Sequence, residues 1–161
     1  MSVKIGDKLP TATFRVMTAD GPKPRASDEI FAGRKVVLFG VPGAFTPTCH
    51  KNHLPGFLQQ AEAFKAKGVK EIAVVSVNDV HVMGAWAKAT GGEEKITYLA
   101  DGNCDFIKAL GLAFDASAGG MGERSKRFAM LVENGVVKLL NVEDIPSKAD
   151  ASSATVLLGQ I

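Results

Sequence analysis

The length, composition and charge of the chain narrow the kinds of protein it can be. Its 161 residues suffice for a single domain, 1–161, with a sizeable buried core. A content of 46% hydrophobic and 22% charged residues is that of a globular protein. The net charge of +2, without a basic cluster, argues against nucleic acid and anionic membranes as partners. No apolar run approaches the roughly 18 residues that span a bilayer.

The N-terminus and the cysteines indicate the compartment. The first residues, M-S-V-K-I-G-D-K-L-P, lack the apolar stretch of a signal peptide, so we expect a cytoplasmic protein unless a transit peptide preceded this numbering. Two cysteines, Cys49 and Cys104, are too few for the disulfide framework of a secreted protein. Their separation fits no zinc motif, and nothing else in the sequence predicts a cofactor.

Apolar patterns and turn residues predict alternating strands and helices along the first two thirds of the chain. The expected elements, in chain order, are an edge strand over 11–16, a loop or hairpin over 17–25, a short helix over 28–32 capped by Ser27, a buried strand over 36–40, a helix from Thr46-Pro47 to about Lys67, a buried strand over 71–77, a helix from Asn78-Asp79 to about Thr90, a strand over 96–100, a turn over 101–103 and a helix over 104–110.

The last third of the chain contains the strongest turn signal. Asn134-Gly135 separates two apolar runs, 128–133 and 136–142, and this dipeptide favours a two-residue hairpin turn. A closing helix is expected over 149–158. Strands that alternate with helices and then give way to a hairpin predict an α/β fold with a mixed sheet.

Thr46, Pro47 and Cys49 mark the start of the predicted long helix. Thr is a favoured N-cap and Pro is favoured at the first helical position, which makes Cys49 the third helical residue. Free N–H groups and the positive end of the helix dipole favour a thiolate there, and the thiolate is the nucleophilic form of cysteine. The Thr46 hydroxyl can hydrogen-bond to the sulfur one turn away. The alternative is that Cys49 is only a small buried hydrophobic residue.

Further along the same helix, proline and apolar residues predict its shape. Pro55 lacks the N–H that would bond to the Lys51 carbonyl, so we expect a kink at Pro55-Gly56. Three apolar residues then recur on one face and predict a stripe that faces the core: Phe57, Ala61 and Phe64.

Pro42, Thr46 and Cys49 match the P-x-x-x-[TS]-x-x-C signature of the peroxiredoxins. The run V-P-G-A-F-T-P-T-C, followed by K-x-H-L-P-G-F, resembles the type II, or peroxiredoxin-5-like, branch of that family. The similarity continues through three later motifs: S-V-N-D at 76–79, L-A-D at 99–101 and R-F-A-M at 127–130.

This resemblance implies a thioredoxin-like fold, with a central mixed β-sheet flanked by helices. It also implies a thiol-dependent peroxidase in which hydrogen peroxide or an alkyl hydroperoxide oxidises Cys49 to a sulfenic acid. Thr46 and Arg127 would stabilise the negative charge that develops on the leaving oxygen, and Pro42 would shield the sulfur. The residues alone explain Arg127 equally well as a surface charge at a strand end; the resemblance assigns it to the site.

Regeneration of Cys49 requires a second thiol. Thr46 replaces the first cysteine of the thioredoxin C-x-x-C motif, which excludes a local disulfide. Related peroxiredoxins with an internal disulfide carry their second cysteine where Val74 stands or in the C-terminal segment, but 149–161 contains none. Cys104 is at neither position, although a helix start would make it somewhat acidic and exposed. We therefore expect a one-cysteine cycle completed by glutathione and glutaredoxin; a thioredoxin-dependent cycle through Cys104 is the alternative.

Two other functions are disfavoured. A redox-inactive thioredoxin-like adaptor or sensor would be expected to lose Thr46, Cys49 or Arg127, and all three are present. His50 and His53 are close to Cys49 in sequence, but residues 49 and 50 do not share a helix face, so we expect surface or packing histidines and no metal site. If His50 were charged and close to the sulfur, it would favour the thiolate further.

The resemblance also implies a homodimer, because type II peroxiredoxins commonly pair through loops around the active site. The segments expected at that interface are the apolar stretch Gly43, Ala44 and Phe45 and the turn formed by Asn78, Asp79 and Val80. No partner is predicted beyond the second protomer, the hydroperoxide and the thiol reductant.

Overall fold

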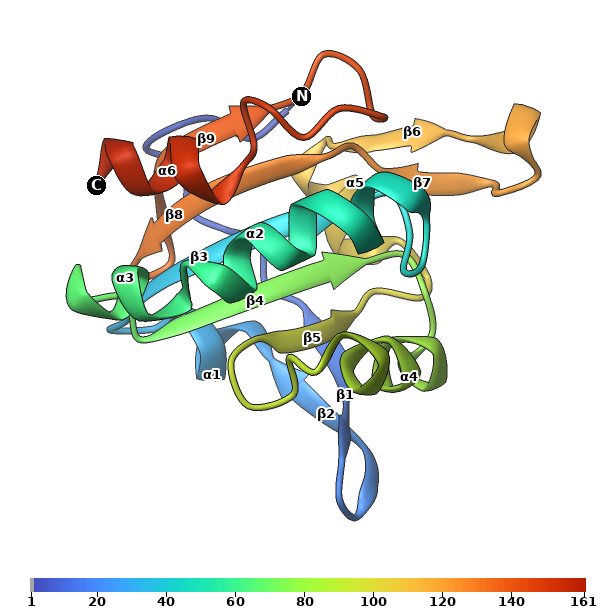
Figure 1. Ribbon diagram of the computed structural model, residues 1–161, viewed down its shortest axis with the longest axis horizontal. Helices are drawn as coiled ribbons and strands as arrows, with labels where there is room; N and C mark the ends of the chain where they lie inside the picture. The colour runs from blue at the N-terminus through green and yellow to red at the C-terminus, as the bar shows by residue number, and fades with distance from the viewer. Residues whose placement is uncertain (1) are drawn as a thin grey trace.

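A mixed β-sheet of seven strands forms the centre of the protein (Figure 1). The structure, a computed structural model, describes residues 2–161. The strand order of the sheet is β2-β1-β5-β4-β3-β8-β9, and β6 and β7 form a separate two-stranded sheet. The strands are β1 (Thr13–Thr18), β2 (Gly21–Ala26), β3 (Lys35–Val41), β4 (Glu71–Ser76), β5 (Thr97–Ala100), β6 (Ala113–Asp115), β7 (Glu123–Ser125), β8 (Phe128–Glu133) and β9 (Val136–Val142). The helices are α1 (Ser27–Phe31), η1 (Cys49–His53), α2 (Leu54–Gln59), α3 (Ala61–Ala66), α4 (Val80–Thr90), α5 (Asp105–Leu110), η2 (Ser117–Gly119) and α6 (Ala154–Gln160).

Helices cover both faces of the sheet, so its central strands are buried on both sides. In β3, Val37 and Phe39 belong to one core, whereas Val36 and Leu38 belong to the other. Residues of α2, α3, α4 and α6 fill the first core, and residues of α1 and α5 fill the second. Figure 1 shows α2 and α3 lying along β3 and β4. Burial on both faces explains the unbroken apolar run of β3.

The strongest local signals in the sequence are confirmed. α4 begins after Asp79, whose carboxylate accepts a hydrogen bond from the Val82 N–H at 2.9 Å. Asn134 and Gly135 adopt φ values of 48° and 76° and join β8 to β9 as a hairpin. The sheet is mixed, as predicted, because β3, β4 and β5 run parallel while the remaining neighbours pair antiparallel.

Two predictions near the N-terminus are wrong in detail. β1 is an internal strand that pairs with β2 and β5, and the edge strand is β2. Pro22 and Pro24 of β2 cannot donate to a neighbouring strand, which an edge position tolerates. Ser27 is the first residue of α1 and not its cap, because its hydroxyl accepts a hydrogen bond from the Ala12 N–H at 3.0 Å.

The helix that begins near Cys49 is more irregular than predicted. η1 is a π-helical turn in which the Leu54 N–H bonds to the Cys49 carbonyl, and the chain leaves helical geometry at Gln60, between α2 and α3. Pro55 offers no N–H to the Lys51 carbonyl and its ring crowds that carbonyl, so the preceding turn widens. The distortion therefore lies one turn before the predicted kink and includes Cys49.

The C-terminal third differs from the prediction in two places. β6 and β7 were not predicted, because three-residue strands carry no periodic signal. α6 begins at Ala154, after its Ser153 cap, and not at residue 149. Residues 143–153 connect β9 to α6 without regular structure, and we call this segment the 143–153 loop. Within residues 2–161, every helix is too short or too polar to cross a membrane.

Candidate active site

Cys49 lies beyond the C-terminal end of β3, where the 42–46 loop gives way to the helix. The helix begins at Pro47, and the Thr46 carbonyl accepts a hydrogen bond from the His50 N–H at 2.9 Å. Thr46 is therefore the N-cap residue and Cys49 the third helical residue, as predicted. The Cys49 side chain has no exposed surface.

Two side chains form hydrogen bonds with the sulfur. Thr46 Oγ1 lies 2.8 Å from Cys49 Sγ, and Arg127 Nη2 donates to the same sulfur at 3.0 Å. Thr46 Oγ1 also lies 2.7 Å from the Gly43 carbonyl, and its single hydrogen can serve only one of these acceptors at a time. Beside a thiol, the hydroxyl donates to Gly43 and accepts the thiol proton; beside a thiolate, it can donate to the sulfur. Thr46 thus accommodates both protonation states of Cys49.

Arg127 immediately precedes β8 and is buried, with 2% of its surface exposed. Its Nε donates to the Pro146 carbonyl at 2.9 Å, its Nη1 to His53 Nδ1 at 3.0 Å, and its Nη2 to Cys49. Among residues 2–161, no carboxylate forms an ion pair with this guanidinium. A buried cation without a counter-charge is costly, and the donors of this guanidinium face a carbonyl, a ring nitrogen and the Cys49 sulfur. The interpretation of Arg127 as a surface charge is wrong.

His53 connects Arg127 to the 143–153 loop. Its Nε2 lies 2.9 Å from the Ser152 carbonyl and must donate to it, so Nδ1 carries the lone pair that accepts from Arg127. Burial, and then the Arg127 charge, lower the pKa of His53 to about 3, so the ring is neutral at pH 7. His53 packs against both Phe39 and Phe57, as a packing histidine should, but its bond to Arg127 was not predicted. The sequence signal that could have placed His53 in the site was its i, i+4 spacing from Cys49, because residues four apart lie on the same face of a helix.

The neutral state of His53 makes stability depend on pH. The pKa of His53 is lower in the folded chain, about 3, than its usual value of 6.5, so the unfolded chain binds the proton more readily. The free energy of unfolding should therefore fall as the pH drops from about 6.5 towards 3, with this residue contributing up to about 1.4 kcal/mol per pH unit. Urea unfolding of His53→Gln should show a shallower fall than wild type, and His81→Gln, at an exposed histidine, should not. Equal pH dependence in all three proteins would contradict this.

Pro42 is buried at the start of the 42–46 loop, where Arg124 holds it in place. Arg124 Nη1 donates to the Pro42 carbonyl at 3.2 Å, and Arg124 Nε donates to the Met121 carbonyl at 2.9 Å. A Cβ atom on Gly43 would lie 2.8 Å from Arg124 Nη1, so glycine permits this close approach. Arg124 belongs to β7, a strand with no sequence signal, and its contact with the loop was therefore missed.

His50 does not supply the positive charge considered from the sequence. Its Nδ1 accepts a hydrogen bond from Trp86 Nε1 at 3.1 Å, and an accepting ring nitrogen carries no proton. The ring also stacks on Phe45, with 5.6 Å between the ring centroids. His50 is a packing residue that connects the active-site loop to α4.

Cys104 lies in the second core, on the opposite face of the sheet from Cys49. The expectation of an exposed, somewhat acidic thiol is wrong: Cys104 is 3% exposed, and burial together with the Asp101 carboxylate raises the pKa of its thiol. Cys104 does precede α5, in a left-handed conformation with φ of 64°. Both cysteines are free, and with the sheet between them they cannot pair within one chain in this conformation.

The two segments expected at a dimer interface are joined by a hydrogen bond. Asn78 Oδ1 accepts from the Ala44 N–H at 2.9 Å and from the Ser76 hydroxyl at 2.5 Å. Phe45 follows with φ of 65°, an unusual conformation for a bulky residue, and 47% of its surface is exposed. The 42–46 loop thus presents an apolar ring that is about half exposed to solvent.

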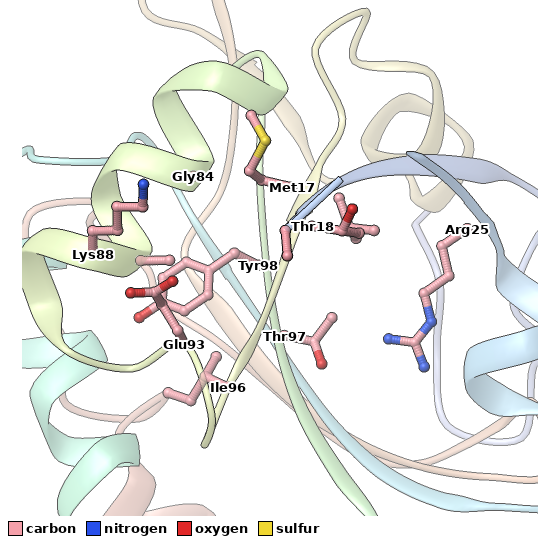
Figure 2. A pocket seen from close by; sticks show the side chains of 12 residues that line it. Met17, Thr18, Arg25, Gly84, Lys88, Glu93, Ile96, Thr97 and Tyr98 are labelled. Carbon is pink, nitrogen blue, oxygen red and sulfur yellow. The ribbon is translucent and has the colours of Figure 1, made fainter. Parts of the chain in front are cut away.

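A separate cavity of about 480 Å³ lies between the β1–β2 hairpin, α4 and β5 (Figure 2). Met17 and Tyr98 contribute apolar and aromatic surface to it, and Lys88 and Glu93 contribute charges of opposite sign. Neither cysteine lines this cavity. The polar contacts of the Cys49 sulfur, and not this cavity, therefore define the candidate active site.

Comparison with known proteins agrees with this geometry. A family model described as Redoxin matches residues 4–158, so the chain belongs to the Redoxin family. A crystal structure of reduced Prx3 from Vibrio vulnificus in complex with H2O2 is 50% identical in sequence and has a TM-score of 0.92, with 98% of each chain covered.

The curated relatives are peroxiredoxins. Peroxiredoxin-2C of Oryza sativa subsp. japonica is 49% identical over 143 residues, which cover 88% of both chains. The chloroplastic peroxiredoxin-2E-2 of the same organism is 50% identical over 148 residues, which cover 89% of this chain and 66% of that protein. The chain is a peroxiredoxin, a thiol-dependent peroxidase that acts on a hydroperoxide and needs a thiol reductant, and the predicted thioredoxin-like fold is confirmed.

Proposed function

We propose that this peroxidase uses Cys49 as its peroxidatic cysteine. The observation that carries the proposal is the surrounding of the sulfur, which is buried and contacts the Thr46 hydroxyl at 2.8 Å and the Arg127 guanidinium at 3.0 Å. Pro42, whose carbonyl accepts a hydrogen bond from Arg124, is a buried residue at the start of the loop that leads to Thr46. The test is the rate of Cys49 oxidation in variants of these residues, described in the Discussion.

The chemical step follows from this arrangement. The Cys49 thiolate attacks one peroxide oxygen, so that a sulfur–oxygen bond forms and the oxygen–oxygen bond breaks. The second oxygen leaves as hydroxide or alkoxide and takes a proton from solvent, while Cys49 becomes a sulfenic acid. Arg127 and Thr46 donate to the atoms on which negative charge develops and so stabilise the transition state. The H2O2 complex of the Vibrio vulnificus neighbour supports hydrogen peroxide as one substrate.

We further propose a one-cysteine cycle in which glutathione and glutaredoxin return Cys49 to the thiol. An external thiol attacks the sulfenic acid, water leaves, and a second thiol then reduces the mixed disulfide. The burial of Cys104 on the far face of the sheet supports this proposal over a thioredoxin-dependent cycle through Cys104. The latter would require Cys104 to leave its core.

Replacing Cys104 tests the one-cysteine cycle. Cys104→Ser should retain wild-type turnover of hydrogen peroxide with glutathione and glutaredoxin, because the residue takes no part in the proposed cycle. NADPH consumption in the coupled assay measures this turnover, and Cys49→Ser should abolish it. Cys104→Ala provides a second variant, since a buried serine can lose stability without an acceptor. Loss of turnover in both Cys104 variants, with Cys49 still oxidised by peroxide, would contradict the proposal.

We also propose a homodimer that pairs through the 43–45 and 78–80 segments. The exposed Phe45 ring and the hydrogen bond that joins Ala44 to Asn78 support a single surface formed by the two segments. Light scattering should give a dimer for wild type and a monomer for Phe45→Asp, because the interface would have to bury an unpaired charge. Ile5→Asp, at an exposed residue near β9, should remain dimeric. A monomeric wild type, or a dimeric Phe45→Asp, would contradict this interface.

For the location of the protein we propose the cytoplasm. Two cysteines are too few for the disulfide framework of a secreted protein. Cell fractionation with an antibody against the chain tests this, and recovery from an organelle or from the exported fraction would contradict it.

A further inference from the structure

The 143–153 loop provides acceptors for the side chains around Cys49. The Pro146 carbonyl accepts from Arg127 Nε at 2.9 Å, and the Ser152 carbonyl accepts from His53 Nε2 at 2.9 Å. The Ser147 carbonyl accepts from the hydroxyl of Thr48, the residue before Cys49, at 2.8 Å. The direction of the Arg127 guanidinium therefore depends on where this loop places its carbonyl groups.

The ends of this loop are joined by one buried carboxylate. Glu143 Oε2 accepts hydrogen bonds from both the N–H and the hydroxyl of Ser152, each at 2.7 Å. Ser152 has no exposed surface and Glu143 is 9% exposed, so water cannot readily replace these bonds. At its other end, the Glu143 N–H donates to the Arg127 carbonyl at 2.9 Å. Glu143 thus fixes Ser152 relative to the backbone of Arg127.

Each nitrogen of the Arg127 guanidinium has its own acceptor, so the orientation of the group depends on where the 143–153 loop places its carbonyl groups. Nε is taken by Pro146 and Nη1 by His53, which leaves Nη2 for the sulfur. Both the Pro146 and the Ser152 carbonyls belong to the segment that Glu143 closes. If this segment opened, Arg127 Nε would lose its acceptor, the Pro146 carbonyl. His53 would lose the Ser152 carbonyl, and Arg127 Nη1, which donates to His53, would then be less firmly held.

We propose that Glu143 is a positioning residue for the reaction of Cys49. By closing the loop onto Ser152, it orients the carbonyl groups that hold His53 and Arg127, and through them the donor that faces the sulfur. This inference rests on the proposed roles of Cys49 and Arg127. A role limited to the docking of α6 is the competing explanation, and it predicts lower stability without a specific change at Cys49.

The rate constant for oxidation of Cys49 by hydrogen peroxide, measured by stopped flow, tests the proposal. Glu143→Ala should lower this rate constant about 10- to 100-fold, since small misplacements of catalytic groups have effects of that size. Glu143→Gln should restore most of the rate, because its amide oxygen can accept both Ser152 bonds. Glu133→Ala, at a partly exposed carboxylate at the end of β8, is the matched control and should react like wild type.

A double-mutant cycle with Arg127→Lys separates positioning from stability. If Glu143 acts through Arg127, Glu143→Ala should change the rate far less in the Arg127→Lys background than in wild type. Equal effects in both backgrounds, or a wild-type rate for Glu143→Ala, would overturn the proposal. Should Glu143→Ala fail to fold, Glu143→Asp takes its place, because a side chain shorter by one methylene cannot keep both bonds. A wild-type protein that is not oxidised at Cys49 would instead refute the proposed active site.

Discussion

Replacing Arg127 with lysine should lower the rate constant for Cys49 oxidation about 100-fold, the size of effect seen when a donor to a developing oxyanion is removed. Lysine keeps the positive charge but replaces a planar fork of five N–H donors with one ammonium group. It cannot bond to Pro146, to His53 and to the sulfur in the three directions of the guanidinium. A positive charge would remain near Cys49, but the N–H donor that points at the sulfur would be lost.

Stopped-flow measurement with hydrogen peroxide gives this rate constant directly. Arg15→Lys is the matched control, because Arg15 is an exposed residue of β1 outside the active site. Circular dichroism should show the same fold in both variants and in wild type. An Arg127→Lys protein that reacts as fast as wild type would show that charge alone suffices and would contradict the directional role of Arg127.

Replacing Thr46 with valine should lower the same rate constant by about 100-fold as well. Valine has nearly the shape of threonine but lacks the hydroxyl that lies 2.8 Å from the sulfur and 2.7 Å from the Gly43 carbonyl. The thiolate would lose its second donor, and the thiol would lose the acceptor of its proton. Both losses act at the atom that reacts.

Thr46→Ser distinguishes the hydroxyl from the methyl group. Serine keeps a hydroxyl that can donate to the sulfur and is also a good N-cap residue, so its rate should remain close to that of wild type. A slow reaction in Thr46→Ser together with a wild-type rate in Thr46→Val would indicate that packing by the methyl group, and not hydrogen bonding, determines reactivity.

Local signals in the sequence were sufficient for much of the fold. The Asn134-Gly135 hairpin, the Asp79 cap and the apolar run of β3 each depend on neighbours along the chain, and each was correctly predicted. The placement of Cys49 as the third helical residue also follows from local preferences, because Thr46 and Pro47 set the helix start. The π-helical turn has the predicted cause, Pro55, although the geometry changes one turn earlier.

Those local signals could not predict contacts between segments that are distant in the sequence. His53 was expected to pack, but its bond to Arg127 joins residues 74 positions apart. Arg124 acts from a strand too short to be predicted, and the burial of Cys104 depends on which face of the sheet α5 covers. The assignment of Arg127 to the site came from the family resemblance, because the residue pattern alone fitted a surface charge equally well.

The most direct test of the account is the intact mass of the reduced protein after one equivalent of hydrogen peroxide, without any reductant. We predict the gain of one oxygen atom and the loss of thiol labelling at Cys49 alone, which would show a sulfenic acid that awaits an external thiol. Loss of two hydrogen atoms, with Cys49 and Cys104 both protected from labelling, would show a disulfide between them. That result would contradict the one-cysteine cycle and would direct the search for the reductant to thioredoxin.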